Sequence, residues 1–267
     1  MKQDGYLNIN TKYNFVIGIV VSREDKASMN IAQFLTEKWR KEDEIFFHEE
    51  KFLVFIDDMH LYHDSIDAEL EKKYGIKPEV IIFPSRHKAK AERKTLSVHP
   101  IGNYGNADFG GKEKELVLSS PALMTNALRM LYEKAKGMDY EICFEVTHHG
   151  PYLSTPSFFI EVGSTEREWM DMDACKKIAE VLHELNFPPN KKIALGIGGG
   201  HYAPRFTDIA LKEGISFGHM IPEYHLNSLD KKTAEKMIDA TPGVKYAFFH
   251  GKGKNYKKIF EDLGLEV

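Results

Sequence analysis

The stretch Phe15-Val-Ile-Gly-Ile-Val-Val21 is a continuous apolar run rich in β-branched residues, which indicates a buried β-strand. An amphipathic segment at 27–39 follows it, with Ile31 and Leu35 on one face of a predicted helix. The apolar run Phe52–Ile56 then predicts a second strand. Strand, helix and strand in this order are typical of an α/β fold with a parallel sheet.

The same alternation extends along the rest of the chain. Further strands are predicted at 79–83, 95–99, 141–147, 157–162, 192–197, 215–218 and 244–249. Further helices are predicted at 120–136, 165–185, 206–212, 231–240 and from about residue 255 onward. We therefore expect an α/β three-layer sandwich with a mainly parallel sheet, as a single domain over residues 1–267. Residues 85–120 are rich in charge, Gly and Asn, and an open alternative is that they form a small subdomain or an excursion from the sheet.

Composition excludes several classes of protein. Hydrophobic residues make up 42% of the 267 residues and charged residues 28%, which is typical of a globular chain. The apolar runs have the length of strands and the N-terminal segment lacks the features of a signal peptide, so we expect a cytoplasmic protein without membrane contact. Cys143 and Cys175 stand apart, which argues against a disulfide framework and against a zinc site built from cysteines.

The charge distribution limits the kind of partner. A net charge of −4 argues against a general nucleic-acid coat protein, and we expect no DNA partner. Two local basic stretches, at 86–94 and 252–258, interrupt this acidic balance. Each is either solvated surface or a local contact for phosphates beside a site.

Histidines follow the predicted strands at repeated positions. They are His87, His99, His148, His149, His201 and His219. In an open parallel sheet, ligands bind in the crevice beyond the carboxyl ends of the strands. We therefore expect histidines that are distant in sequence to converge on one site there.

Further residues in these loops indicate hydrolytic chemistry. Gly198-Gly199-Gly200 lets the backbone approach a ligand closely, and the adjoining His201 and Arg205 favour an anion or oxyanion site. The chain lacks a nucleophilic-serine elbow, and neither cysteine lies in a histidine loop, so we expect water to be the nucleophile. Histidine activates water either directly as a general base or through a bound Zn²⁺. Glu145 precedes His149 by an even number of residues and either orients it or pairs with a basic residue.

These motifs together resemble the archaeal-type D-aminoacyl-tRNA deacylase family. The segments that carry the resemblance are Ser85–Lys88, Ser97–Asn103, Glu145–Pro151, Phe159–Ser164 with Trp169, Gly198–Phe206 and Gly218–Met220. The resemblance implies hydrolysis of the ester that joins a D-amino acid to the 3′ end of tRNA. It also implies zinc as cofactor and a fold related to peptidyl-tRNA hydrolases and nucleoside phosphorylases. The oligomeric state is not predicted.

On this resemblance we assign roles by chemistry. The expected metal ligands are His87, His99, His148 and His219. The expected catalytic residues are His149, His201 and Glu145, together with the oxyanion-binding backbone of Gly199 and Gly200. The expected contacts to the acceptor end of tRNA are Arg86, Lys88 and Arg205. Tyr202 and Phe206 are candidates for a wall that excludes L-amino acids. The alternatives are another metal- or histidine-dependent hydrolase, a nucleoside phosphorylase-like enzyme, and a noncatalytic protein that binds tRNA ends.

Overall fold

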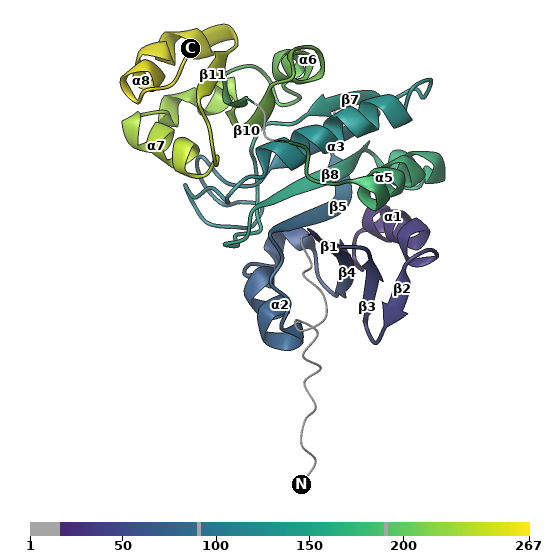
Figure 1. Ribbon diagram of the computed structural model, residues 1–267. Coiled ribbons are helices and arrows are strands. Elements are labelled where there is room, and N and C mark those ends of the chain that lie inside the picture. Colours follow the sequence, from purple (N-terminus) through teal and green to yellow (C-terminus); the bar gives the residue numbers. More distant parts are fainter. Residues whose placement is uncertain (1–16, 90–91, 190–191) are drawn as a thin grey trace.

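An eight-stranded sheet runs through the larger part of the molecule in the computed structural model, which describes residues 17–89, 92–189 and 192–267 (Figure 1). Its strands lie in the order β2-β3-β4-β1-β5-β8-β6-β7. They are β1 (Ile17–Ser22), β2 (Arg40–Glu42), β3 (Ile45–His48), β4 (Lys51–Ile56), β5 (Val80–Lys88), β6 (Thr95–Pro100), β7 (Glu141–Phe144) and β8 (Ser157–Ser164). The predicted run from Phe15 begins two residues outside the described part of the chain.

The four central strands of this sheet, β4, β1, β5 and β8, are parallel, and antiparallel pairs occur on either side of them. Strand β1 pairs in parallel with β4 and β5, and β5 pairs in parallel with β8. Strand β6 runs antiparallel to β8 and parallel to β7, while β2 and β3 add an antiparallel hairpin beside β4. The predicted α/β fold with a large, mainly parallel sheet flanked by helices is confirmed.

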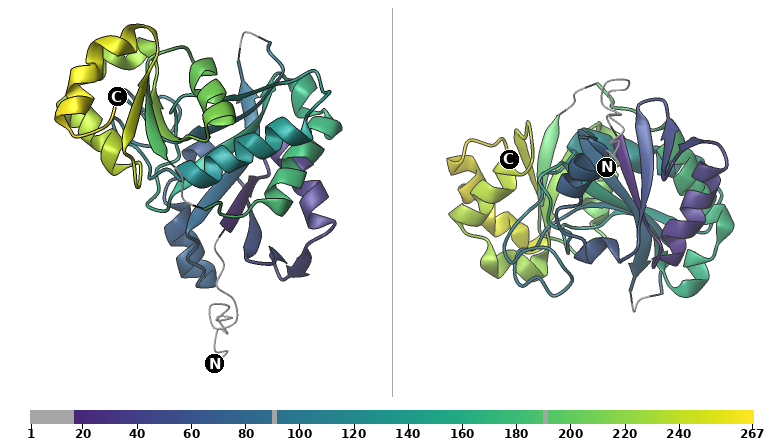
Figure 2. Two further views of the ribbon diagram at one scale, coloured as in Figure 1. Left: turned by 45° about the horizontal axis from the view of Figure 1, so that its top comes forward. Right: turned by 90° about the horizontal axis from the view of Figure 1, so that it is seen from below.

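Three helices cover one face of the sheet, as Figures 1 and 2 show. They are α1 (Lys26–Thr36), α3 (Pro121–Lys134) and α5 (Met172–Glu184). Asp25 caps α1 by accepting a hydrogen bond from the Ser28 N–H. The helix predicted at 165–185 is divided into α4 (Glu166–Trp169) and α5, because Asp171 caps a new helix by accepting from two N–H groups.

The opposite face carries less regular structure. The 3₁₀ helix η2 (His60–Tyr62) and helix α2 (Ile66–Tyr74) pack there against β1, β4 and β5. Of the stretch 85–120, residues 85–88 are the end of β5 and residues 95–100 are β6, so both belong to the large sheet, and residues 101–120 follow as an irregular segment on this face.

The C-terminal part forms a second sheet. Its three strands lie in the order β10-β9-β11 and are all parallel, with α6, α7 and α8 packed around them (Figure 1). The elements are β9 (Ile193–Ile197), α6 (Pro204–Glu213), β10 (Ser216–Ile221), η3 (Glu223–Ser228), α7 (Lys231–Asp239), β11 (Tyr246–Phe249), η4 (Gly251–Tyr256) and α8 (Lys257–Asp262). The two sheets are joined by backbone hydrogen bonds from Val146 N–H to His201 O (2.9 Å) and from Thr147 N–H to Met220 O (3.0 Å).

Over residues 17–89, 92–189 and 192–267, the helices are too short or too polar to span a membrane.

Candidate active site

The sequence alternation of β5, β8 and β6 gives these strands one polar face. Residues paired across neighbouring strands point to the same side of a sheet. The paired rows are Phe83, Phe159 and His99; Ser85, Glu161 and Ser97; and His87, Gly163 and Thr95. His87, His99 and Glu161 therefore all lie on the same face of the sheet.

The residues between these positions point to the helices. Ile82, Leu96, Val98, Ile160 and Val162 are buried in the core with α1, α3 and α5. The polar face is buried as well, since Glu161 and His99 are at most 2% exposed. Buried ionisable groups need partners, so the side chains of this face must satisfy one another.

The histidines meet on this face and not beyond the carboxyl ends of parallel strands. Strands β5 and β6 run in opposite directions, so His87 and His99 near their ends lie at opposite ends of the polar face. Glu161 lies midway between them, with Oε2 at 3.5 Å from His87 Nδ1 and 3.7 Å from His99 Nε2. The expected convergence of the histidines is found, but a single crevice beyond the carboxyl ends of parallel strands is not, because β6 and β7 run antiparallel to β5 and β8.

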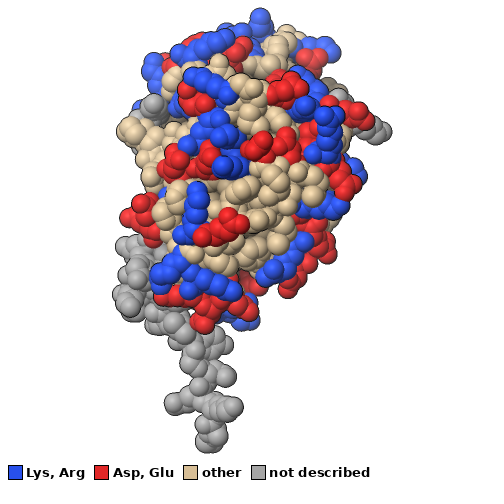
Figure 3. Space-filling model, turned by 90° about the vertical axis from the view of Figure 1, so that its right-hand side faces the viewer, with Lys and Arg blue, Asp and Glu red and all other residues tan. Residues whose placement is uncertain are grey.

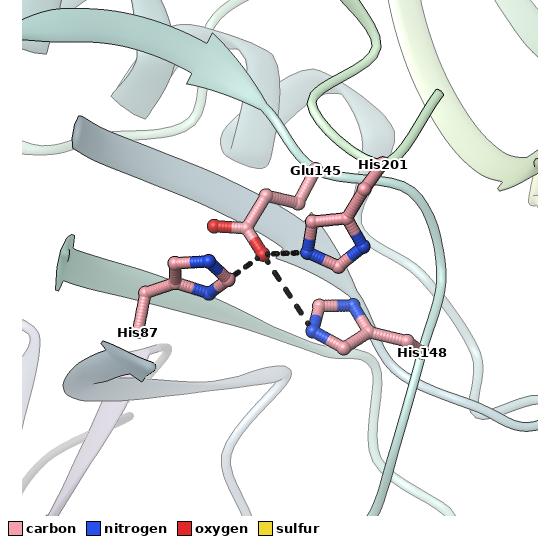
Figure 4. A group of neighbouring side chains, drawn as sticks. All are labelled: His87, Glu145, His148 and His201. Carbon is pink, nitrogen blue, oxygen red and sulfur yellow. Dashed lines mark hydrogen bonds and ion pairs between the residues drawn. The ribbon is translucent and has the colours of Figure 1, made fainter. Parts of the chain in front are cut away.

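Glu145 is the carboxylate at which three of the histidines meet (Figure 4). Its Oε2 lies 3.0 Å from His87 Nδ1, 2.9 Å from His201 Nε2 and 3.6 Å from His148 Nε2. Its Oε1 accepts a hydrogen bond from Ser97 Oγ at 2.5 Å. The residue follows β7 directly, and its N–H donates to Val98 O of β6, which fixes the carboxylate at the sheet surface.

These contacts hold both carboxylates ionised. Burial opposes ionisation of Glu145, but the neighbouring His87 and His201 outweigh it and keep the pKa of Glu145 well below its usual range. Burial also opposes ionisation of Glu161, but the contact with His87 outweighs it and lowers the pKa of Glu161 to about 2. Burial lowers the pKa of His87, but Glu145 and Glu161 outweigh this and raise it to about 11. His87 is therefore an imidazolium ion between two carboxylates.

The rings of His99, His148 and His149 form a compact group. The ring centroids of His99, His148 and His149 lie 4.2, 4.9 and 4.4 Å apart, and their ligand atoms lie within 4.8 Å of one another. Each Nδ1 hydrogen-bonds to a backbone carbonyl: His99 to Pro100 O at 3.1 Å, His148 to Val146 O at 2.8 Å and His149 to Gly150 O at 2.6 Å. A carbonyl only accepts, so each Nδ1 carries a proton and each Nε2 is the ring nitrogen left to bind a ligand.

This arrangement fits a metal ion such as zinc. Burial lowers the pKa of His148 well below its usual value, so its Nε2 lone pair faces the Glu145 carboxylate as one acceptor against another. The Nε2 of His99 is buried and has no hydrogen-bond partner among the described residues. Imidazole nitrogens whose other N–H donates to a carbonyl are the usual surroundings of protein-bound zinc. A cation bound by these Nε2 atoms would resolve both mismatches.

We call the seven residues His87, His99, Glu145, His148, His149, Glu161 and His201 the His/Glu cluster. A pocket of about 510 Å³ opens onto it. Its lining consists of Asn103, Gly105, Asn106, Asp108, Phe109, His148, His149, His201, Tyr224 and His225. His201 lines this pocket while its Nε2 contacts Glu145, so it connects the pocket with the buried carboxylate.

The structure does not bring His219 into the cluster. Its ring is fully buried, with Nδ1 at 3.0 Å from Thr147 Oγ1 and Nε2 at 2.9 Å from Val117 O. Both nitrogens are therefore committed to hydrogen bonds within the protein. Burial lowers the pKa of His219 to about 4, so the ring is neutral and holds the joint between the two sheets. The expectation that His219 binds metal was wrong for this reason.

The glycine loop lies at the same joint. Gly198 and Gly199 have φ values of +91° and +83°, a conformation that favours glycine. An added Cβ would lie 2.1 Å from His250 O at Gly198 and 2.7 Å from His250 Nδ1 at Gly199. This close packing accounts for both glycines, whereas a Cβ on Gly200 would meet open space. An oxyanion role for Gly199 and Gly200 remains a prediction.

The predicted tRNA contacts lie at the surface. Arg86 is half-buried with its guanidinium 5.0 Å above the Trp169 ring, while Lys88 and Arg205 are exposed. Lys90 of the first basic stretch lies outside the described residues. Figure 3 shows basic and acidic side chains interleaved over the side of the molecule that lies to the right in Figure 1. On this side, any contact with tRNA phosphates is therefore limited to small groups of basic side chains.

Sequence reasoning missed Glu161 and misjudged one aromatic residue. The missed signal was a carboxylate in the middle of the otherwise apolar strand Phe158–Val162, where a solvated position is excluded. Tyr202 lies in the cluster region, with its hydroxyl 3.2 Å from His87 Nε2. Phe206 is fully buried in the core, so it cannot form a wall of the substrate pocket.

Comparisons with known proteins show which family the chain resembles. Residues 74–267 match the family model described as D-aminoacyl-tRNA deacylase. Curated D-aminoacyl-tRNA deacylases of Thermococcus kodakarensis and Pyrococcus abyssi are 38% and 41% identical to the chain, each over 93% of this chain and 97% of its own length. A crystal structure titled as a conserved protein of unknown function is 34% identical, with a TM-score of 0.86 over 94% of this chain and 92% of its own.

Proposed function

Because the chain belongs to the D-aminoacyl-tRNA deacylase family and is an enzyme that hydrolyses D-aminoacyl-tRNA, we propose that the His/Glu cluster is its active site. The observation that carries this proposal is the Glu145 carboxylate, which is buried, ionised and in contact with three histidines, beside a pocket open to substrate. Perturbed ionisable groups that converge at a pocket are characteristic of catalytic sites.

We assign the metal to His99, His148 and His149. Their Nδ1–H groups are held by backbone carbonyls, which leaves three Nε2 lone pairs for one ion. A zinc ion bound there would supply Lewis acidity, which lowers the pKa of water and polarises an ester carbonyl. From the sequence we expected His87 among the metal ligands and His149 among the catalytic residues. The geometry supports His149 as a metal ligand and His87 as a partner that positions Glu145.

His201 is the proposed general base. Glu145 accepts from His201 Nε2–H, so the neutral ring has its lone pair on Nδ1. This Nδ1 lies 3.4 Å from the hydroxyl of Tyr224, a residue of the pocket. His201 can therefore take a proton from water at Nδ1 while Glu145 stabilises the imidazolium that forms. The same proton can then be given to the 3′ oxygen of the leaving tRNA.

His87 and Glu161 are proposed to position Glu145. The His87 imidazolium neutralises the two carboxylates and keeps Glu145 fixed toward His201. The backbone N–H groups of Gly199 and Gly200 remain candidates for the oxyanion, and Arg86, Lys88 and Arg205 for phosphates of the acceptor end. Because aminoacyl-tRNAs are made in the cytoplasm, we propose that the enzyme acts there.

The decisive experiment measures amino acid release from matched D- and L-tyrosyl-tRNA. We expect rapid release of D-tyrosine and slow release of L-tyrosine. Dialysis against a chelator should remove bound zinc and abolish release, and added Zn²⁺ should restore both. His148→Ala and His149→Ala should lose zinc, whereas His201→Ala should keep it and still be inactive.

Three results would overturn parts of this proposal. Equal rates on the two enantiomers, or full activity of His201→Ala, would show that the cluster is not the stereospecific active site. Full activity in metal-free protein would refute the metal assignment and leave a mechanism based on His201 and Glu145 alone.

A further inference from the structure

The pocket beside the His/Glu cluster contains a carboxylate that no described residue of the chain neutralises. Asp108 is exposed and lines the pocket. No hydrogen bond or ion pair of its side chain is formed within residues 17–89, 92–189 and 192–267, and within these residues it supplies the only carboxylate of the pocket lining. The lining also contains no Lys or Arg among those residues.

An unpaired carboxylate is unfavourable for binding a polyanion. The phosphates of tRNA are repelled by negative charge, so a carboxylate at this position lowers affinity unless it meets a cation of the substrate. An aminoacyl-tRNA with a neutral side chain carries one cation near the scissile ester, which is the α-ammonium group. This group is separated from the ester carbonyl by a single carbon atom.

The chain holds Asp108 next to the cluster by its backbone. The N–H of Gly150 donates to Phe109 O at 3.1 Å, and the N–H of Gly102 donates to His149 O at 2.9 Å. The side-chain amide of Asn103 also donates to Gly110 O at 3.0 Å. Phe109, which follows Asp108, is thus hydrogen-bonded to Gly150, which follows His149. The segment around Asp108 cannot move away from the cluster without breaking these hydrogen bonds.

From this geometry we propose that Asp108 binds the α-ammonium group of the D-aminoacyl ester and is a specificity-determining residue of the reaction. The inference rests on the proposed function, since it needs the ester carbonyl at the His/Glu cluster. Asp108 then accepts charge-assisted hydrogen bonds from the ammonium group at one side of the pocket.

This contact has a stereochemical consequence. With the carbonyl carbon at the cluster and the nitrogen at Asp108, two substituents of the α-carbon are fixed. The side chain and the hydrogen must then exchange places between the D and the L enantiomer. The pocket can discriminate between these two directions only while the nitrogen is held, so Asp108 contributes to the preference for D-amino acids as well as to affinity.

The test combines one variant with two substrates. Asp108→Asn keeps the shape and removes the charge, and it should fold normally because its side chain is exposed. The substrates are D-tyrosyl-tRNA and N-acetyl-D-tyrosyl-tRNA, in which acetylation removes the positive charge. We expect Asp108→Asn to lower kcat/KM for the free amine by about tenfold to a hundredfold, as expected for a charged hydrogen bond, and to leave the acetylated substrate unaffected.

Glu113→Gln is the matched control. It removes one negative charge from the same segment, but Glu113 does not line the pocket. A general effect of charge on tRNA binding would change both variants and both substrates alike. We expect the ratio of kcat/KM for D-tyrosyl-tRNA to kcat/KM for N-acetyl-D-tyrosyl-tRNA to change only in Asp108→Asn. The ratio of the rates on D- and L-tyrosyl-tRNA should also become smaller in this variant.

The outcomes separate this inference from the proposed function. If wild-type protein releases D-tyrosine selectively but Asp108→Asn retains the wild-type substrate ratio, Asp108 does not bind the ammonium group. An equal loss on both substrates also contradicts the inference. If wild-type protein releases neither enantiomer, it is the proposed function that fails.

Discussion

The two faces of strands β5, β8 and β6 are built from alternate residues of the same segments and serve opposite purposes. On one face, Ile82, Ile160 and Val98 pack against α1, α3 and α5. On the other, His87 and Glu161 form a buried ion pair, and His99 Nε2 lies 3.7 Å from the same carboxylate. Neighbouring residues such as Ile160 and Glu161 are therefore under different physical constraints.

The comparison shows how the fold remains stable although the burial of the charged groups in its active site is unfavourable. Burying two carboxylates costs free energy that their histidine partners only partly return. The helix-covered face stabilises the same strands by apolar burial, so the strands hold their positions while the opposite face is arranged for chemistry. Changes on one face should then affect activity, and changes on the other should affect stability.

The largest effect is expected for Glu145→Gln on the polar face. The variant keeps the shape of the side chain but removes the charge that stabilises protonated His201. We expect kcat to fall by about 10²–10⁴-fold, which is the usual contribution of acid–base catalysis. Single-turnover release of D-tyrosine measures it. Glu141→Gln, at the start of β7 and paired with Arg93 at the surface, should keep wild-type kcat.

Ile160→Ala tests the other face. Ile160 is fully buried, and its truncation leaves a cavity against the helices. We expect the free energy of unfolding to fall by about 2–5 kcal/mol, with kcat per folded molecule nearly unchanged. Denaturant unfolding and activity measured on the same sample decide this. Ile160→Val should show a smaller loss of stability, and a loss of kcat in either variant would refute the division of the two faces.

Gly163→Ala should affect both properties. A Cβ on Gly163 would lie 2.9 Å from His87 Cβ and 2.6 Å from Thr95 Oγ1, so His87 must shift. We expect a stability loss of about 1–3 kcal/mol from overpacking, together with reduced kcat at temperatures where the variant is folded. A variant that loses stability but retains wild-type kcat would show that the position of His87 does not matter for catalysis.

The smallest effect concerns histidines on the helix side. Trp39 Nε1–H donates to His183 Nδ1 at 3.0 Å, and His183 stacks on His48 with centroids 4.0 Å apart. Burial, and then the neighbouring His48, lower the pKa of His183 below its ordinary value of 6.5. Because the folded pKa is depressed, this contribution to stability is present above pH 6.5 and is lost as pH falls through the folded pKa.

The measurement for this pair is the unfolding midpoint as a function of pH. Wild-type protein should lose stability on acidification below about pH 6.5, where free histidine becomes protonated. His183→Phe keeps an aromatic ring in the stack but cannot be protonated, so its midpoint should depend less on pH over the same range. An identical pH dependence in both proteins would show that this pair does not contribute.

Much of the larger sheet was predictable because its buried strands are apolar runs, such as Phe52–Ile56. The short hairpin of β2 and β3 and helix α2 were missed, since α2 buries only Ile66 and Leu70 and has a weak apolar pattern. The separation of β9, β10 and β11 into a second sheet was also not predicted. Strand pairing is decided by contacts between distant segments, which local periodicity does not contain.

For the site, position after a strand identified five of the seven residues of the His/Glu cluster, and Glu145 was found through its spacing to His149. His219 shares this sequence position but is used to hold the joint, so the rule cannot distinguish a ligand from a structural histidine. Glu161 was missed because it lies inside a strand and not after one. The alternation of polar residues on β5, β8 and β6 would have identified it.

The joint between the two sheets makes the active site sensitive to a partial separation of the sheets. Glu145 comes from the large sheet and His201 from the small one, and the hydrogen bonds of Val146 and Thr147 close the seam between them. Partial opening at this seam would separate base from carboxylate while both sheets kept their secondary structure. Enzyme inactivation in mild denaturant should therefore precede the loss of circular dichroism, and amide exchange at Val146 and Thr147 should follow inactivation.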